Sequence, residues 1–191
     1  MIQNILLVSD VHDNKLEEAE INSVVKGSTV NAVLFLGDVQ QSIMEFCKTR
    51  FYTAYFFGAV KGNHDDRVPF PPFVTPLNMA VENCGTLKIA GIDGCLAYKD
   101  VGHFLLSDLQ IFEMLQTLPD VDLLITHGPP SFHAKDDGVH FGSEALAKFI
   151  LDGHCRYLIH GHIHEERITP IGNFEDQRYA ISVRKLKMIR V

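Results

Sequence analysis

Five short apolar runs divide this chain, and each of them is followed by residues that can bind a metal ion. The runs cover residues 5–8, 33–36, 55–57, 123–126 and 157–159. Apolar runs of this length are typical of strands that are buried on both faces of a sheet. In open α/β sheets, ligands bind just beyond the carboxyl ends of the strands. We therefore expect a metal-binding region that is assembled from the whole chain.

Two pairs of potential ligands have a spacing of two residues. Asp10 and His12 follow the first run, and His162 and His164 follow the last one. In an extended chain, residues i and i+2 point to the same side, so both members of a pair could face one ion. Gly161 would let the backbone turn tightly before the second pair.

The other three runs lead to single candidate ligands. These are Asp38 after Gly37, Asn63 in the segment that follows residues 55–57, and His127. Gly37 has no side chain and would permit a close approach of the backbone. A lone histidine is more often a surface or core residue than a ligand, so the metal hypothesis depends on the complete set.

Composition limits the classes of protein that the chain can represent. With 191 residues, it suits a single domain over residues 1–191. The net charge is −7 and there is no basic block, which argues against duplex nucleic acid as a partner. No apolar stretch approaches the roughly 20 residues of a membrane span, and no secretory signal is evident. Four cysteines without a C-x-x-C pair favour reduced thiols and a cytoplasmic location.

Helical patterns alternate with the apolar runs and predict an α/β fold. We expect three helices, with starts at Asn14 (with Glu17 as capping partner), Ser107 and Ser143. Residues 78–98 suggest one or two hairpins, and residues 166–191 suggest further strands with Tyr179, Ile181 and Val183 on one face. A second, partly antiparallel sheet is expected from these two regions.

The polar residues after the runs closely resemble the motifs of the calcineurin-like metallophosphoesterase family. The family pattern is D-x-H, G-D, G-N-H-D/E, H and G-H-x-H. It stands here as Asp10-Val11-His12, Gly37-Asp38, Gly62-Asn63-His64-Asp65, His127 and Gly161-His162-Ile163-His164. The resemblance implies a four-layer α/β/β/α sandwich with two mixed β-sheets flanked by helices, and a small, compact member of the family.

The same resemblance implies two divalent metal ions that share Asp38 as a bridging ligand. Asp10, His12, Asp38 and His164 would hold the first ion, and Asp38, Asn63, His127 and His162 the second. Mixed histidine and carboxylate ligands suit Mn, Fe, Zn or Ni better than Ca, and Mn is the expected metal. A hydroxide that bridges the two ions would attack the phosphorus atom of a small phosphate ester, with diesters favoured over monoesters.

Four residues in and after the third motif are candidates for contact with the substrate or for supporting that contact. By resemblance, His64 would assist the leaving group as a general acid or bind phosphate as a cation. Asp65 would orient His64, or it would cap a turn. Asn63 and Arg67 are candidate phosphate contacts, although Arg67 could equally be a solvated surface residue.

Other histidines and two loops complete the prediction. We expect His160 to be structural, and we expect His103, His133, His140 and His154 at the surface. Of these, His133 and His140 could reach the substrate, because the loop 128–141 follows His127. The loops 66–76 and 128–141 would then determine which substrate is accepted.

Two alternatives to a phosphodiesterase remain open. The first is a non-catalytic protein-interaction scaffold of the same fold, and the second, which the acidic charge disfavours, is a nuclease. The segment Gly37-Asp38-Val39-Gln40-Gln41-Ser42 lacks the Asp and Arg of the G-D-x-V-D-R-G motif, which argues against a protein phosphatase. A homo-oligomer is compatible with the sequence.

Overall fold

The computed structural model describes residues 3–11 and 16–191. His12 and Asn14, which the sequence suggested as a metal ligand and a helix cap, lie outside the described residues.

The first sheet has five strands in the order β13-β1-β2-β3-β4. Their bounds are β1 (Asn4–Val8), β2 (Ala32–Leu36), β3 (Phe56–Val60), β4 (Thr75–Pro76) and β13 (Leu186–Arg190). Strands β1 to β4 are parallel, and β13 is antiparallel to β1. The carboxyl ends of β1, β2 and β3 therefore meet at one edge of this sheet.

The second sheet has six strands in the order β11-β12-β10-β9-β6-β5. Their bounds are β5 (Val81–Cys84), β6 (Leu87–Ile92), β9 (Val121–Thr126), β10 (Cys155–His160), β11 (Arg167–Ile171) and β12 (Arg178–Ser182). The four inner strands are parallel, and the two edge strands, β5 and β11, are antiparallel to their neighbours. Two short strands, β7 (Cys95–Leu96) and β8 (Leu105–Leu106), form a separate parallel pair.

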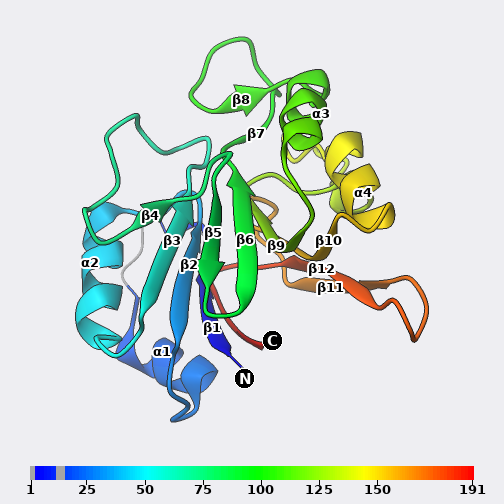
Figure 1. Cartoon of the computed structure of the whole chain (residues 1–191). Coiled ribbons are helices and arrows are strands. Elements are labelled where there is room, and N and C mark those ends of the chain that lie inside the picture. The colour runs from blue at the N-terminus through cyan, green and yellow to red at the C-terminus, as the bar shows by residue number, and fades with distance from the viewer. Residues whose placement is uncertain (1–2, 12–15) are drawn as a thin grey trace.

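The sheets pack face to face because alternate strand residues are apolar on both sides. Leu7 and Leu34 of the first sheet share a buried cluster with Leu123 and Ile159 of the second. The alternate residues of the first sheet, such as Phe35, pack against α1 (Glu18–Val25) and α2 (Gln41–Arg50). Those of the second sheet pack against α3 (Asp108–Thr117) and α4 (Glu144–Leu151). Figure 1 shows the resulting order of layers, which confirms two mixed sheets flanked by helices.

Two of the three predicted helix starts are confirmed. Ser107 accepts a hydrogen bond from the Gln110 N–H, and Ser143 accepts one from the Leu146 N–H. The predicted start of the first helix was wrong, because Glu17 itself is the N-cap and the Glu20 carboxylate accepts from its N–H. No capping signal marks α2 in the sequence, because the side chain of its N-cap residue does not cap the first turn of the helix.

The expectation of one or two hairpins in residues 78–98 is met by one hairpin. Strands β5 and β6 form the antiparallel hairpin around Gly85. The second turn, at Asp93-Gly94, leads instead to β7, while β6 pairs in parallel with β9. Tyr179, Ile181 and Val183 do share one face, which packs between the two sheets. The chain then returns to the first sheet through β13.

Within residues 3–11 and 16–191, no helix combines the length and apolar character needed to cross a bilayer.

Candidate metal centre

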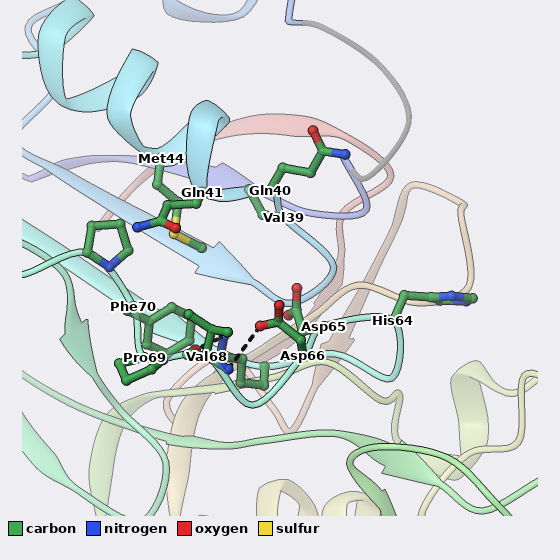
Figure 2. Close-up of a pocket in the computed structure, with 12 residues that line it drawn as sticks. Val39, Gln40, Gln41, Met44, His64, Asp65, Asp66, Val68, Pro69 and Phe70 are labelled. Atoms are coloured by element: carbon green, nitrogen blue, oxygen red, sulfur yellow. Dashed lines mark hydrogen bonds between the residues drawn. The ribbon is translucent and has the colours of Figure 1, made fainter.

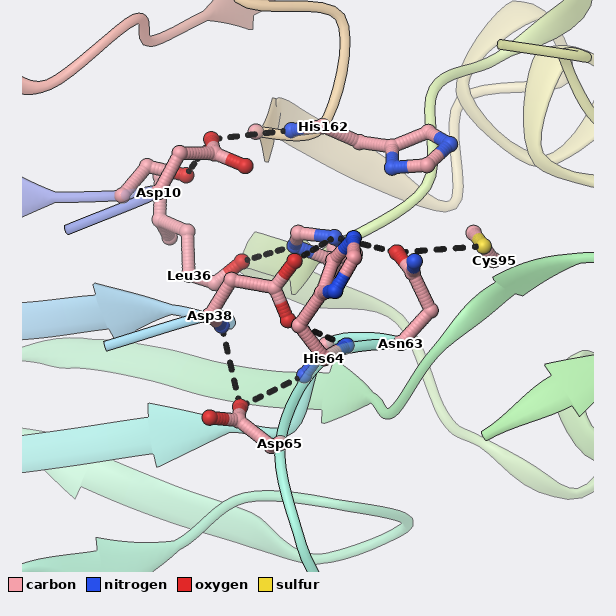
Figure 3. Close-up of polar contacts among 12 residues, drawn as sticks. Asp10, Leu36, Asp38, Asn63, His64, Asp65, Cys95 and His162 are labelled. Atoms are coloured by element: carbon pink, nitrogen blue, oxygen red, sulfur yellow. Dashed lines mark hydrogen bonds and ion pairs between the residues drawn. The ribbon is translucent and has the colours of Figure 1, made fainter. Parts of the chain in front are cut away.

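The segments that follow β2, β3 and β9 bring three potential ligands into direct contact. His127 Nε2 lies 3.2 Å from Asp38 Oδ2 and 3.0 Å from Asn63 Oδ1. All three residues are buried. The exposed fraction is 0% for His127, 2% for Asp38 and 7% for Asn63. Figure 3 shows the side chains of Asp38 and Asn63 directed into the same region of the site. Oxygen and nitrogen atoms of the kinds that bind transition metals therefore converge on one point.

One hydrogen bond to the backbone fixes the orientation of the His127 ring. Its Nδ1 lies 2.9 Å from the Leu36 carbonyl oxygen, so Nδ1 donates its proton there and Nε2 points to Asp38. Metal-binding histidines usually place their second nitrogen on a carbonyl or carboxylate in this way. Asn63 is oriented in turn, because its Nδ2 donates to the Tyr98 hydroxyl at 3.1 Å.

The pKa values of the Asp38–His127 pair move in opposite directions. Burial alone would raise the pKa of Asp38, but the charge and hydrogen bond of His127 outweigh it and hold this pKa at about 2. Burial alone would lower the pKa of His127, but Asp38 outweighs it and raises this pKa to about 9. Without a metal ion, these shifts favour a carboxylate next to an imidazolium, because each charge stabilises the other.

Asp10 and His162 bring a second group of polar atoms to the same region. Asp10 Oδ2 accepts hydrogen bonds from the Ser9 hydroxyl at 2.6 Å and from the His162 N–H at 3.0 Å. Asp10 Oδ1 and His162 Nε2 are buried and have no hydrogen-bond partner among the described residues. Burial and the neighbouring His127 lower the pKa of His162 to about 3, so its ring is neutral.

These atoms fit a metal ion. Ligand atoms of Asp10, Asp38 and His127 all lie within 4.8 Å of one another. A buried carboxylate oxygen and a buried neutral imidazole nitrogen without partners carry lone pairs that a cation would satisfy. His164 is exposed and lies at the same strand end, and His12 lies outside the described residues.

The backbone around the centre adopts an unusual conformation at four candidate ligands. Asp10, Asp38, His162 and His164 have φ angles of 56°, 54°, 67° and 52°. Residues other than glycine seldom occupy this left-handed region, and such strain is concentrated at functional sites. The tight turns aim these side chains back across the ends of the strands.

The glycines of the motifs are needed for close packing. A Cβ atom at Gly62 would overlap the Asp38 carboxylate, and one at Gly161 would overlap the Ser9 hydroxyl. A Cβ atom at Gly37 would lie 2.6 Å from His127 Nδ1. The close approach predicted for Gly37 is therefore confirmed.

Asp65 holds two loops together next to the centre. Its Oδ2 accepts from the Asp38 N–H at 2.9 Å and from the Gly62 N–H at 2.8 Å, while Asp38 Oδ1 accepts from the His64 N–H at 2.8 Å. Asp65 therefore accepts hydrogen bonds from backbone N–H groups. This agrees with the second of its two expected roles, which was to cap a turn. The side chains of His64 and Arg67 are exposed.

The remaining histidines differ in part from the prediction. His103 and His154 are exposed, and His160 is fully buried on its strand, as expected. The surface position predicted for His133 was wrong, because His133 is fully buried and its Nδ1 lies 2.7 Å from His160 Nε2. His133 can be buried because His160 forms a hydrogen bond with its ring nitrogen.

Several residues that support the centre were missed by the sequence reasoning. They are Ser9, Tyr98 and Cys95, whose Sγ donates to Asn63 Oδ1 at 3.6 Å. Ser9 adjoins the first motif, but the others lie in segments without any local motif. Only the packing of the two sheets brings them to the site.

Comparison with known proteins agrees with this arrangement. The family model for calcineurin-like phosphoesterases matches residues 3–166. The chain belongs to the calcineurin-like phosphoesterase family. The matched range contains all five of the sequence motifs. No curated protein sequence matches the chain at a significant level.

Solved structures of similar fold have low sequence identity to this calcineurin-like phosphoesterase. The phosphopantetheinyl hydrolase of Mycobacterium tuberculosis is 14% identical with a TM-score of 0.58, over 98% of this chain and 95% of that one. Vps29 from Entamoeba histolytica, in complex with zinc, is 17% identical with a TM-score of 0.53, over 94% and 73%. The TT1561 protein of Thermus thermophilus is 12% identical with a TM-score of 0.54, over 99% of each chain. At these identities the similarity concerns the fold.

Proposed function

We propose that this protein is a dinuclear-metal phosphoesterase that hydrolyses phosphodiesters or small phosphate esters. The observation that carries the proposal is the convergence of Asp10, Asp38, Asn63 and His127 at the ends of strands from both sheets. Because the ligands come from both sheets, we also propose that residues 1–191 work as one catalytic domain.

The ligand set would divide between two ions, with Asp38 as a ligand of both. Asp10, His12, Asp38 and His164 would hold one ion, and Asp38, Asn63, His127 and His162 the other. Two divalent cations and two carboxylates leave a surplus of positive charge, which favours an anionic substrate. When bound, the metal ions would supply Lewis-acid charge and lower the pKa of a coordinated water. The mixed ligands favour Mn, with Fe, Zn and Ni as alternatives, and zinc is the metal in the Vps29 structure from Entamoeba histolytica.

A cavity next to His64 supports an organic leaving group. It has a volume of about 450 Å³, and its lining includes His64, Asp65, Met44 and Phe70. Figure 2 shows His64 at one end of this cavity and the apolar side chains of Met44 and Phe70 at the other. An organic group attached to the phosphate could pack there while His64 assists its departure.

The wall of this cavity is held in place by Lys61. Its Nζ donates to the Val68 carbonyl oxygen at 2.9 Å and lies 4.2 Å from the centre of the Phe70 ring. These contacts fix part of the loop 66–76 against β3. We propose that this loop selects the leaving group.

A second cavity, which is lined by two of the proposed metal ligands, supports the preference for diesters. It has a volume of about 670 Å³ and is lined by Asp10, His164, Glu20, Arg184 and Lys185. A phosphodiester carries two organic groups. The cavity next to His64 could hold one of them, and this second cavity could hold the other. A monoester would leave one of the two cavities empty.

A substrate panel with metal reconstitution tests the proposal. The apoprotein is loaded with Mn, Ni, Fe or Zn and assayed with an aryl phosphodiester, the matched aryl monoester, cyclic nucleotides and single-stranded DNA. We expect turnover of the diester that depends on added metal and exceeds turnover of the monoester. Absence of turnover with all four metals would contradict the proposal and favour the scaffold. Cleavage of DNA alone would favour the nuclease.

A further inference from the structure

The loop that follows His127 is anchored at both ends. Residues 131–133 form a 3₁₀ turn, and His133 is fully buried against His160. The Ser131 N–H donates to the Ser143 carbonyl oxygen at 2.9 Å, and the Lys135 N–H donates to that of His140 at 3.0 Å. The intervening residues are therefore held close to the strand ends.

Asp137 makes three hydrogen bonds to residues 139–140, and one of them is to the ring of His140. Its Oδ2 lies 2.6 Å from His140 Nδ1, and its Oδ1 accepts from the N–H groups of Val139 and His140 at 3.0 and 2.9 Å. Since the carboxylate can only accept, Nδ1 carries a proton. The other nitrogen, Nε2, takes part in none of the hydrogen bonds found among the described residues. Only 19% of the His140 side chain is exposed.

The ring of His140 lies against two of the proposed metal ligands. Its centre is 4.8 Å from that of His162 and 5.7 Å from that of His164. The rings of His127 and His162, both proposed for the same ion, are 4.9 Å apart. His140 is therefore as close to His162 as a proposed co-ligand is.

The buried pair of His133 and His160 shows what a structural histidine pair looks like. Their rings are 5.0 Å apart. All four ring nitrogens are in hydrogen bonds, through the contact between the two rings, the Thr169 hydroxyl and the Gly161 carbonyl oxygen. Every nitrogen of this pair is thus already engaged, whereas His140 retains Nε2.

We propose that His140 is an additional ligand of the metal centre. In this proposal, the Asp137 carboxylate orients the His140 ring through Nδ1, so that Nε2 is available to the metal. This inference rests on the proposed metal centre. A carboxylate that accepts from one ring nitrogen while the other binds the ion is the usual arrangement of metal-binding histidines. An added imidazole would favour borderline cations such as Zn²⁺, Co²⁺ or Ni²⁺ over Mg²⁺.

The test compares His140→Ala and Asp137→Asn with His154→Ala. His154 is a matched control, because its Nδ1 lies 2.8 Å from Asp120 in an exposed histidine–carboxylate pair. Affinities for Zn²⁺ and Co²⁺ are measured by titration calorimetry, and the visible spectrum of the Co²⁺ form is recorded. We expect His140→Ala to weaken one binding step about 10–100-fold and to change the spectrum, Asp137→Asn to act in the same direction, and the control to change neither.

A fourth variant separates ligation from packing. His140→Phe keeps an aromatic ring against His162 and His164 but removes the nitrogen. Loss of affinity in this variant, with an unchanged unfolding temperature of the apoprotein, supports ligation. Wild-type affinity and spectrum in either His140 variant would overturn it.

The outcome also separates this inference from the proposed function. If wild-type protein hydrolyses the diester while the His140 variants bind metal normally, only the inference fails. If wild-type protein binds metal through His140 and hydrolyses nothing, only the proposed reaction fails. If it binds no metal, both fail.

Discussion

Asp38 Oδ2 and His127 Nε2 lie 3.2 Å apart, and Asp38 raises the pKa of His127 to about 9, which favours a proton on Nε2 when no metal is bound. The two residues follow strands of different sheets, β2 and β9. Their attraction therefore links the two sheets when no metal is bound. Metal binding must displace this proton, which couples the affinity for metal to pH.

The first prediction concerns this coupling. Because Asp38 raises the pKa of His127 to about 9, metal bound at Nε2 should release about one proton below that pH. Apparent affinity should then rise about tenfold per pH unit from neutral pH up to about pH 9, where the rise should end. Calorimetric titrations in buffers of different ionisation enthalpy count the released protons.

The variant His127→Gln provides the control for this coupling. It keeps a polar side chain but has no proton to lose, so it should bind metal more weakly and with a smaller dependence on pH. The same pKa shift acts on the metal-free fold. Its stabilising contribution should be full below about pH 6.5 and should be lost as the pH rises through about 9. Affinity that is independent of pH in the wild type would contradict the pairing.

The second prediction concerns His64. Its side chain is exposed and borders the cavity next to the centre, so it should act on the leaving group and not on the metal. His64→Ala should lower kcat by about 10²–10⁴-fold with an unchanged metal content. Steady-state kinetics and metal analysis of the same samples check this, with the exposed His103→Ala as control. Loss of metal in the variant would mean that His64 is a ligand.

The third prediction concerns Gly62. A methyl group there would overlap the Asp38 carboxylate, so Gly62→Ala should displace Asp38 and cost about 1–3 kcal/mol in the free energy of unfolding. Metal affinity should fall with it. Gly27→Ala is the control, because open space surrounds Gly27 and only its φ of 74° opposes a side chain. That variant should lose about 1–2 kcal/mol and retain normal metal affinity. Equal metal affinities in the two variants would count against the packing argument.

The fourth prediction concerns the buried pair His133 and His160. Burial lowers the pKa of His133 to about 4 and that of His160 to about 3, so both are neutral in the folded protein. The unfolded chain binds protons at these residues near pH 6.5. Stability should therefore fall as the pH drops from about 6.5 toward 4, by up to about 1.4 kcal/mol per pH unit for each histidine.

Denaturant unfolding at several pH values tests this against His133→Asn. The variant should show a smaller loss of stability between pH 6.5 and 4, even if it is less stable at neutral pH. Burial raises the pKa of Asp93 to about 6, which acts in the opposite direction in the same range, so the difference between variant and wild type is the relevant quantity. Identical pH slopes would show that the pair does not stay neutral.

Much of the fold could be predicted because its signals are local. The apolar runs became β1, β2, β3, β9 and β10, since a strand buried on both faces needs apolar residues at every position. The Ser107 and Ser143 caps were visible because a capping side chain lies within three residues of the N–H that it accepts from. Helix α2 has no such side-chain cap, and it was missed.

The sequence by itself determined which residues could form a metal centre, because the motifs carry the ligand atoms and the runs before them mark strand ends. Only the tertiary structure decided how these residues meet. It paired Asp38 with His127, buried His133 against His160, and placed His140 against His162 and His164. These contacts join segments that are distant in the sequence or that belong to different sheets, and no local pattern of side chains specifies which of them will touch.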